Sequence, residues 1–296
     1  MTTATPGEFR EVATAVRGTR VRGLVAGPEE GEPLVLLHGL GGSSANWGLI
    51  APSLARRRRV LVVDLPGHGR SEPLPAAPTL APYAHAVLGL AEQEGFLPAT
   101  FVGHSFGGLV AIRTAVRRPE AVRGLVLVSA AGITSSTRMA ERVLAFVGWV
   151  QPGRRISRYW RAVATSDAAR LAVFSHWMAH DPLALDERAV EALLSEINLH
   201  TDTDSAWRAL ARDDPRHDLH LVECPAVLVW GAEDNQLPID DAFDYARRLR
   251  APLRVIAGCG HLPIVERPEA CIGEIESFLD SERAARGGPS HRGAQI

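Results

Sequence analysis

The sequence G-H-S-F-G at residues 103–107 places Ser105 between two glycines at a predicted strand-to-helix turn. An apolar run at residues 99–102 precedes this pattern, and a helical pattern at residues 109–117 follows it. Residues two before and two after a serine in such a turn are so crowded that only very small side chains fit. The turn would place the hydroxyl at a helix N-terminus, where free backbone N–H groups stabilise negative charge. The pattern therefore predicts a serine that attacks a carbonyl carbon.

The same pattern also occurs in ordinary glycine-serine turns, so the assignment depends on finding a base and an acid elsewhere. A serine nucleophile needs a histidine that takes its proton and a carboxylate that orients this histidine. Both follow predicted strands, because Asp234 comes shortly after the apolar run at residues 227–230 and His261 after the run at residues 253–256. The order along the chain is therefore Ser105, Asp234, His261.

Short apolar runs alternate with helical patterns along most of the chain. The strands and helices that these patterns predict must bring Ser105, Asp234 and His261 together. Strands separated by helices predict an α/β fold with a mostly parallel central sheet and helices on both faces. Residues 11–26 read as an antiparallel hairpin at the edge of this sheet. The alternation stops between residues 133 and 215, which hold four of the six tryptophans and several helical patterns. We expect this segment to form a helical cap over the carboxyl ends of the strands, where open α/β sheets bind ligands.

The patterns divide the chain into four predicted parts. Residues 1–132 and 216–280 are the two halves of the sheet domain, and residues 133–215 are the cap. Residues 281–296 are rich in glycine and arginine and show no periodicity, so we expect a flexible tail.

Composition limits the partners and the compartment. The chain has 296 residues, 46% of them hydrophobic, and a formal net charge of −2, which gives no general attraction to nucleic acid or to an anionic membrane. Every basic residue is arginine, so the lysine-containing P-loop is absent from the sequence. The three cysteines form no C-x-x-C pair, which favours a reducing compartment, and no leader-like or membrane-spanning apolar run occurs. We expect a cytoplasmic protein.

The motifs together resemble the α/β-hydrolase superfamily, whose triads run in the order nucleophile, acid, histidine. Three further segments match its loops: L-H-G-L-G-G at residues 37–42, D-L-P-G-H-G-R-S at residues 64–71, and E-R-P-E at residues 266–269. The resemblance spans residues 34–279 apart from the cap and implies the α/β-hydrolase fold. The fold also houses members that are not hydrolases, so the site has to carry the functional argument.

The resemblance implies roles for individual residues. The backbone N–H groups of Leu40 and Phe106 would form an oxyanion hole, with both side chains facing the pocket. The family spacing selects Asp234 as the acid over its neighbours Glu233, Asp240 and Asp241. His38 and His68 do not follow the last strand, so we interpret them, like Asp64, as residues that stabilise loops. His104 either packs beneath the turn or lines the pocket. We expect the substrate to contact Trp149, Trp177 and Leu262.

Acyl transfer to water is the reaction that this resemblance implies, with no metal and no organic cofactor. His176 and His180 are four residues apart but lack the glutamate of an H-E-x-x-H site. A cap rich in aromatic residues favours an ester of a small to medium apolar substrate, with a lactone or thioester close behind. We expect a small-molecule acyl substrate, no nucleic acid partner and no membrane partner, and we leave a homodimer open.

Two other functions remain alternatives. Similar capped members hydrolyse carbon–carbon bonds in ring-cleavage products, and these typically carry Asn before the nucleophile and Trp after the catalytic histidine. This chain has His104 and Leu262 at those positions, which counts against carbon–carbon hydrolysis. A non-catalytic ligand receptor on the same fold is the second alternative, although such a receptor usually lacks a triad member or the oxyanion loop.

Overall fold

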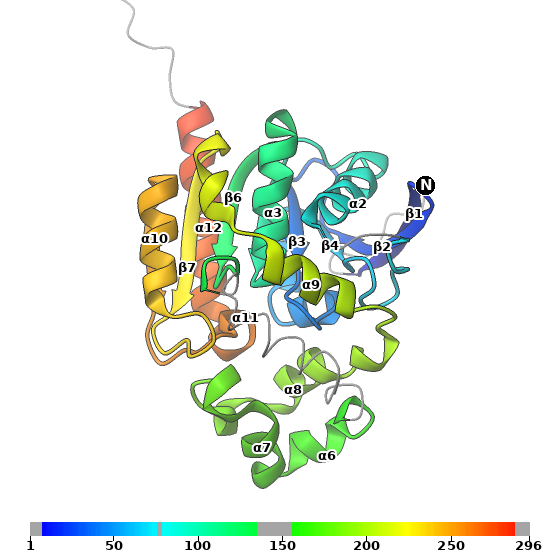
Figure 1. Cartoon of the computed structure of the whole chain (residues 1–296), viewed down its shortest axis with the longest axis vertical. Helices are drawn as coiled ribbons and strands as arrows, with labels where there is room; N and C mark the ends of the chain where they lie inside the picture. Colours follow the sequence, from blue (N-terminus) through cyan, green and yellow to red (C-terminus); the bar gives the residue numbers. More distant parts are fainter. Residues whose placement is uncertain (1–7, 76–78, 135–155, 288–296) are drawn as a thin grey trace, which may run out of the picture.

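The computed structural model describes residues 8–75, 79–134 and 156–287 (Figure 1). Within these ranges, eight strands form one sheet in the order β1-β2-β4-β3-β5-β6-β7-β8. The β2 strand pairs antiparallel with β1 and β4, and all other neighbours pair parallel, which confirms the predicted mostly parallel sheet. The strands are β1 (Arg10–Val16), β2 (Thr19–Ala26), β3 (Pro33–Leu37), β4 (Arg59–Val63), β5 (Ala99–His104), β6 (Val122–Val128), β7 (Ala226–Gly231) and β8 (Leu253–Ile256).

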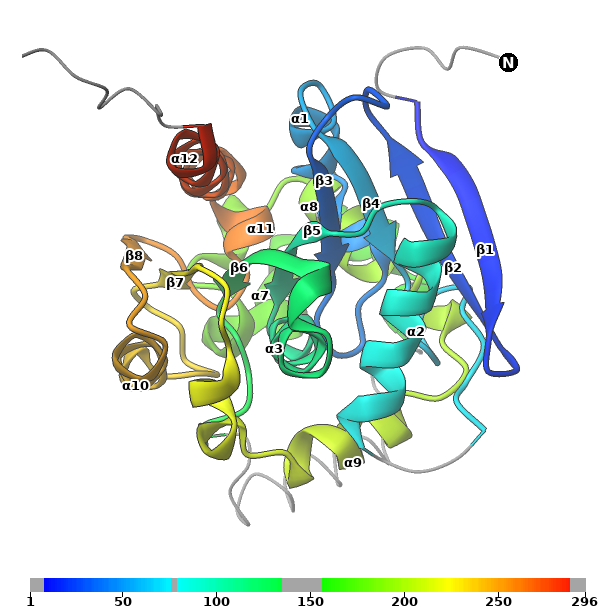
Figure 2. The same cartoon turned by 90° about the horizontal axis from the view of Figure 1, so that it is seen from above.

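Helices cover both faces of the sheet (Figure 2). One face carries α2 (Leu80–Gln93), α3 (Phe106–Arg117) and α10 (Ile239–Leu249), and the other carries α1 (Ala51–Leu54) and α12 (Pro268–Gly287). The short α11 (Pro263–Glu266) precedes α12. This arrangement follows from the parallel pairing, because each crossover between parallel strands places a helix on a face of the sheet.

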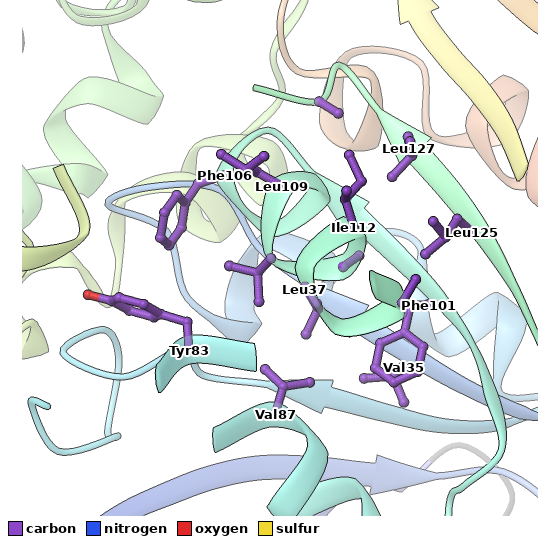
Figure 3. Packing of buried hydrophobic residues seen from close by; sticks show 14 of the residues in the cluster. Val35, Leu37, Tyr83, Val87, Phe101, Phe106, Leu109, Ile112, Leu125 and Leu127 are labelled. Atoms are coloured by element: carbon purple, nitrogen blue, oxygen red, sulfur yellow. The ribbon is translucent and has the colours of Figure 1, made fainter. Parts of the chain in front are cut away.

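Successive side chains on the central strands point to opposite faces of the sheet, as the two-residue period of a strand requires. Val35, Leu37 and Phe101 point toward α2 and α3, where they pack with Tyr83 and Phe106 (Figure 3). The neighbouring positions on the same strands belong to a second cluster on the opposite face, which includes Leu34, Leu36 and Val102. Both faces are therefore apolar, which explains why these strands read as continuous hydrophobic runs.

The described part of the chain between β6 and β7 contains helices and no strand. We call residues 156–217 the helical insertion. It holds α6 (Trp160–Thr165), α7 (Asp167–Met178), α8 (Glu187–Leu194) and α9 (Asp204–Arg212), together with the short 3-10 turns Pro182–Ala184, Ile197–Leu199 and Pro215–His217. Its α6, α7 and α8 lie at the end of the molecule toward which the arrowhead of β7 points (Figure 1). The predicted limits of the cap, residues 133 and 215, stay a prediction.

The last helix is longer than expected. Residues 281–287, which we assigned to a flexible tail, extend α12 to Gly287. Alanine and arginine are strong helix formers, and Arg286 pairs with Glu282 four residues earlier and with Glu32 of the sheet domain. The remaining residues of the predicted tail, 288–296, lie outside the described residues. No helix of the described ranges combines the length and the apolar character that crossing a membrane would need.

Candidate active site

Ser105 sits at a strained turn between β5 and α3, with a φ of 51° and a ψ of −117°. A Cβ on Gly103 would lie 2.4 Å from the carbonyl oxygen of Gly107, and a Cβ on Gly107 would lie 2.3 Å from the carbonyl oxygen of Leu37. Both distances are far below a normal contact, so the prediction that only very small side chains fit at these positions is confirmed, and here even a Cβ atom has no space. The Ser105 amide donates to the carbonyl of Val128 at 2.9 Å, which fixes the turn against β6.

The predicted base and acid meet although they are 27 residues apart. Nδ1 of His261 lies 2.9 Å from Oδ2 of Asp234, and both side chains are almost fully buried. The other carboxylate oxygen, Oδ1, accepts hydrogen bonds at 2.9 Å from the amides of Gln236 and Leu237. Because Nδ1 faces a carboxylate, it carries the proton and leaves the Nε2 lone pair available to accept another one.

The electrostatics of this pair favour an ionised acid. Burial raises the pKa of Asp234, but the nearby His261 and the amides of Gln236 and Leu237 outweigh burial, so the pKa lies below its ordinary value. Asp234 is therefore a carboxylate at neutral pH and can hold the imidazole in one tautomer.

His104, the residue before Ser105, bonds to the backbone of His261. Nε2 of His104 donates to the carbonyl oxygen of His261 at 2.8 Å, and the two rings are 5.1 Å apart. Among the described residues, no hydrogen bond joins the Ser105 hydroxyl to His261. Hydrogen bonds between a catalytic serine and its base often shorten only when substrate binds. The predicted triad stays a prediction. The ring of His104 is buried, and burial lowers its pKa to about 3. Its two expected roles, packing beneath the turn and lining the pocket, stay predictions.

The loop after β3 forms a tight turn that exposes one amide. The Gly42 amide donates to the Gly39 carbonyl at 3.1 Å, and Gly41 has a φ of 70°, as the third position of a type II turn requires. The amide of Leu40, at the second position, donates to no other described residue, and neither does the amide of Phe106 at the start of α3. Among the described residues both N–H groups are therefore without an acceptor, and their role in stabilising an oxyanion stays a prediction.

The structure places the side chains that we expected to face the pocket in different surroundings. The ring of Phe106 is fully buried and packs edge-on against Tyr83 at 5.3 Å, so it belongs to the core (Figure 3). Leu262 is 4% exposed and lies in the hydrophobic cluster on the α12 face. Trp177 lies in α7, where its side chain is not described, and Trp149 lies outside the described residues. A substrate-binding role for Trp149, Trp177 and Leu262 stays a prediction.

Buried polar groups stabilise the two loops that follow β3 and β4, as predicted. His38 accepts from the Leu65 amide at 3.0 Å through Nε2 and donates to the Gly39 carbonyl at 2.7 Å through Nδ1. The Asp64 carboxylate accepts from the Ser44 amide at 2.7 Å and from the Arg22 guanidinium at 2.8 Å. Burial lowers the pKa of His38 to about 4, so its ring is neutral at pH 7.

Glu266 is an important residue that the sequence patterns did not single out. Its buried carboxylate accepts hydrogen bonds from the amides of Gly260 at 3.1 Å and Leu262 at 3.0 Å, which flank His261. It also accepts from the amide of His180 in the helical insertion at 2.7 Å. The only sequence signal was its place in E-R-P-E, which indicated the start of the last helix.

We expect Glu266→Gln to lower the free energy of unfolding by about 1–3 kcal/mol, because the NH₂ group of glutamine cannot accept from backbone amides that then lose their partner. Urea unfolding followed by fluorescence measures this loss. Glu269→Gln, at an exposed position in the first turn of α12, is the matched control and should stay within about 0.5 kcal/mol of the wild type. An equal loss in both variants would contradict the structural role of Glu266.

Stability should fall as the pH drops below about 6.5, because His38 and His104 are buried as neutral rings. Their pKa values are about 4 and about 3 in the folded protein, whereas an unfolded histidine has a pKa of about 6.5. The unfolded chain therefore binds more protons in this range, and each ring should lower the free energy of unfolding by about 1 kcal/mol at pH 5.5. Urea unfolding at pH 7 and pH 5.5 checks this, and an unchanged or higher stability at pH 5.5 would contradict it.

Comparison with known proteins finds relatives that include hydrolases. The chain is 31% identical over 271 residues to the dihydrolipoyllysine-residue acetyltransferase component of the acetoin cleaving system of Pseudomonas putida, covering 89% of this chain and 68% of that protein. It is 34% identical over 261 residues to the pimeloyl-[acyl-carrier protein] methyl ester esterase of Aromatoleum aromaticum, covering 83% and 97%. It is also 28% identical over 296 residues to the 2-hydroxymuconate semialdehyde hydrolase of Pseudomonas sp. strain CF600, covering 95% and 98%.

The fold itself matches solved structures of hydrolases. A putative lipase from Acinetobacter baumannii superposes with a TM-score of 0.76 at 20% identity, covering 94% of this chain and 93% of that one. A family model of the alpha/beta hydrolase fold matches residues 32–268, which is most of the chain. The chain therefore belongs to the α/β-hydrolase family.

Proposed function

We propose that this protein is a serine hydrolase that cleaves a carboxylic ester of a small to medium apolar substrate, with a lactone or thioester as the nearest alternatives. The hydrogen bond between His261 and Asp234 carries the proposal, because it orients the imidazole with Nδ1 toward a carboxylate, while the backbone carbonyl of the same histidine bonds to His104, the residue that precedes Ser105. A serine in a turn with a φ of 51° is costly to hold, and such strain is typical of functional sites.

In the proposed reaction, Nε2 of His261 takes the hydroxyl proton of Ser105 while the serine oxygen attacks the substrate carbonyl. The amides of Leu40 and Phe106 stabilise the oxyanion, and the carboxylate of Asp234 stabilises the imidazolium. His261 then gives its proton to the leaving group, which departs and leaves an acyl-enzyme. Water, deprotonated by the same histidine, releases the acid and restores the serine. Two features support these reaction steps: the lowered pKa of Asp234, and the amides of Leu40 and Phe106, which donate to no other described residue.

Relatives of two hydrolase types bear on the bond that is cleaved. The esterase from Aromatoleum aromaticum is 34% identical over 83% of this chain, and the 2-hydroxymuconate semialdehyde hydrolase is 28% identical over 95% of it. Carbon–carbon hydrolysis is therefore the second candidate. The residues at positions 104 and 262, His and Leu, favour the ester over this candidate, since carbon–carbon hydrolases typically carry Asn and Trp there.

Ser105→Ala should lower the turnover of a p-nitrophenyl ester on the order of a million-fold, because alanine cannot form the acyl-enzyme. A fluorophosphonate probe should label the wild type and the control Ser281→Ala, but not Ser105→Ala. If Ser105→Ala retained more than about a tenth of the wild-type rate, the serine would not be the nucleophile. Absence of labelling in the wild type would instead favour a non-catalytic receptor.

A substrate panel should separate the ester from the carbon–carbon bond. We expect kcat/KM to be higher for p-nitrophenyl esters of short to medium acyl chains than for a dienoate ring-cleavage product, because the proposed pocket takes a small to medium apolar acyl group. Steady-state rates on both substrate types measure this, with Ser105→Ala as the blank for uncatalysed hydrolysis. The opposite order of kcat/KM would assign the protein to carbon–carbon hydrolysis.

A further inference from the structure

His200 reaches from the helical insertion into the two loops beside the active site. It lies between the 3-10 turn Ile197–Leu199 and α9, and its side chain is buried. Its Nδ1 accepts from the Gly69 amide at 2.9 Å, and its Nε2 lies 2.8 Å from the carbonyl oxygen of Gly41, a residue 159 positions earlier in the chain. One imidazole thus links the loop after β3 to the loop after β4.

The two contacts determine the tautomer of this ring. An amide can only donate, so Nδ1 facing Gly69 must present its lone pair. A carbonyl oxygen can only accept, so Nε2 facing Gly41 must carry the hydrogen. His200 therefore makes both hydrogen bonds in a single neutral form, with Nε2–H donating to the Gly41 carbonyl.

Gly41 belongs to the turn that presents the Leu40 amide. The first carbonyl of this turn, that of Gly39, accepts from Nδ1 of His38 and from the Gly42 amide. The carbonyl of Gly41 accepts from His200. The turn is therefore held at its first carbonyl by an imidazole of the sheet domain and at its third residue by an imidazole of the insertion.

Backbone contacts hold His200 in this place. The amides of Thr201 and Asp202 both donate to the carbonyl of Gly67, at 3.0 and 3.1 Å. Gly67 has a φ of 78°, and a Cβ there would lie 2.2 Å from the carbonyl oxygen of Asp202. The glycine of the D-L-P-G motif is thus needed for the insertion to approach this closely.

A second, separate contact links the insertion to the same loop. Nδ2 of Asn46 donates to the carbonyl of Ala192 in α8 at 2.6 Å, while its Oδ1 accepts from the Ser43 amide at 3.0 Å. The loop that follows β3 is therefore connected to the insertion at two points, and each connection ends on a backbone group of the loop.

We propose that His200 is a positioning residue for the oxyanion turn, through which the helical insertion sets the direction of the Leu40 amide. This inference rests on the proposed acyl-transfer function. Since the amide contributes most when negative charge develops on the substrate oxygen, loss of the His200 contact should lower kcat far more than it changes KM.

Two substitutions separate the two hydrogen bonds. His200→Asn places an oxygen three bonds from Cα, like Nδ1, and can keep the Gly69 contact while losing the Gly41 contact. His200→Gln places an NH₂ group four bonds from Cα, like Nε2, and can keep the Gly41 contact. The same change at an exposed histidine of the described chain, His220→Asn, is the control.

We expect His200→Asn to lower kcat on a p-nitrophenyl ester by about tenfold or more, below the 10²–10³-fold typical for removing an oxyanion donor. KM should change little, and fluorophosphonate labelling should slow in parallel with kcat, because the phosphoryl oxygen of this probe occupies the same hole. His200→Gln should recover most of the rate. His220→Asn should match the wild type.

Three results would overturn the inference: kcat of His200→Asn equal to that of the wild type, no recovery in His200→Gln, or a rise in KM that accounts for the whole loss. If the His200 variants do not fold, as judged by thermal melting, Asn46→Ala tests the second link. It should show the same loss in kcat, and an unchanged kcat would overturn the inference. Failure of the proposed function itself is distinct, since the wild type would then show no labelling.

Discussion

Close backbone packing around Ser105 is the constraint on which the rest of the active site depends. The end of β3, the end of β5 and the start of α3 approach so closely that Gly39, Gly103 and Gly107 have no space for an ordinary side chain. A Cβ on Gly39 would lie only 3.3 Å from the Cβ of Ser105. This approach brings the amides of Leu40 and Phe106 to the same end of the sheet as the serine. A larger side chain at any of these glycines would separate the elements that form the site.

The loops around this turn bury many polar groups, and side chains supply hydrogen-bond partners for many of the backbone groups that no sheet ladder reaches. Carboxylates accept from backbone amides, as Asp64, Asp234 and Glu266 each do, and neutral imidazoles of His38 and His104 bond to backbone groups. A buried amide without a partner would cost stability, so each of these side chains replaces the water that the loop excludes.

Among its contacts with the sheet domain, the helical insertion bonds to the loops on both sides of the proposed chemistry. The amide of His261 donates to the carbonyl of Met178 in α7 at 3.2 Å, on the side of the proposed base. His200 and the carbonyl of Ala192 bond to the loop after β3, on the side of the oxyanion turn. A substrate bound between insertion and sheet would therefore contact loops whose geometry depends on both parts of the chain.

The amino-acid sequence by itself determined the parallel sheet, the edge hairpin and the turn at Ser105, because each rests on local rules: the two-residue period of strands, the 3.6-residue period of helices and the space that glycine leaves at a turn. The pairing of Asp234 with His261 was predicted through the family resemblance, and their hydrogen bond confirms that the two side chains meet. Only the tertiary structure decided the structural roles of Glu266, Arg22 and His200, since their hydrogen-bond partners include residues on other elements, up to 159 positions away. The same reason explains the two corrections. The ring of Phe106 packs against the distant Tyr83, and α12 continues to Gly287 through local helix formers together with pairs of Arg286 with Glu282 and with the distant Glu32.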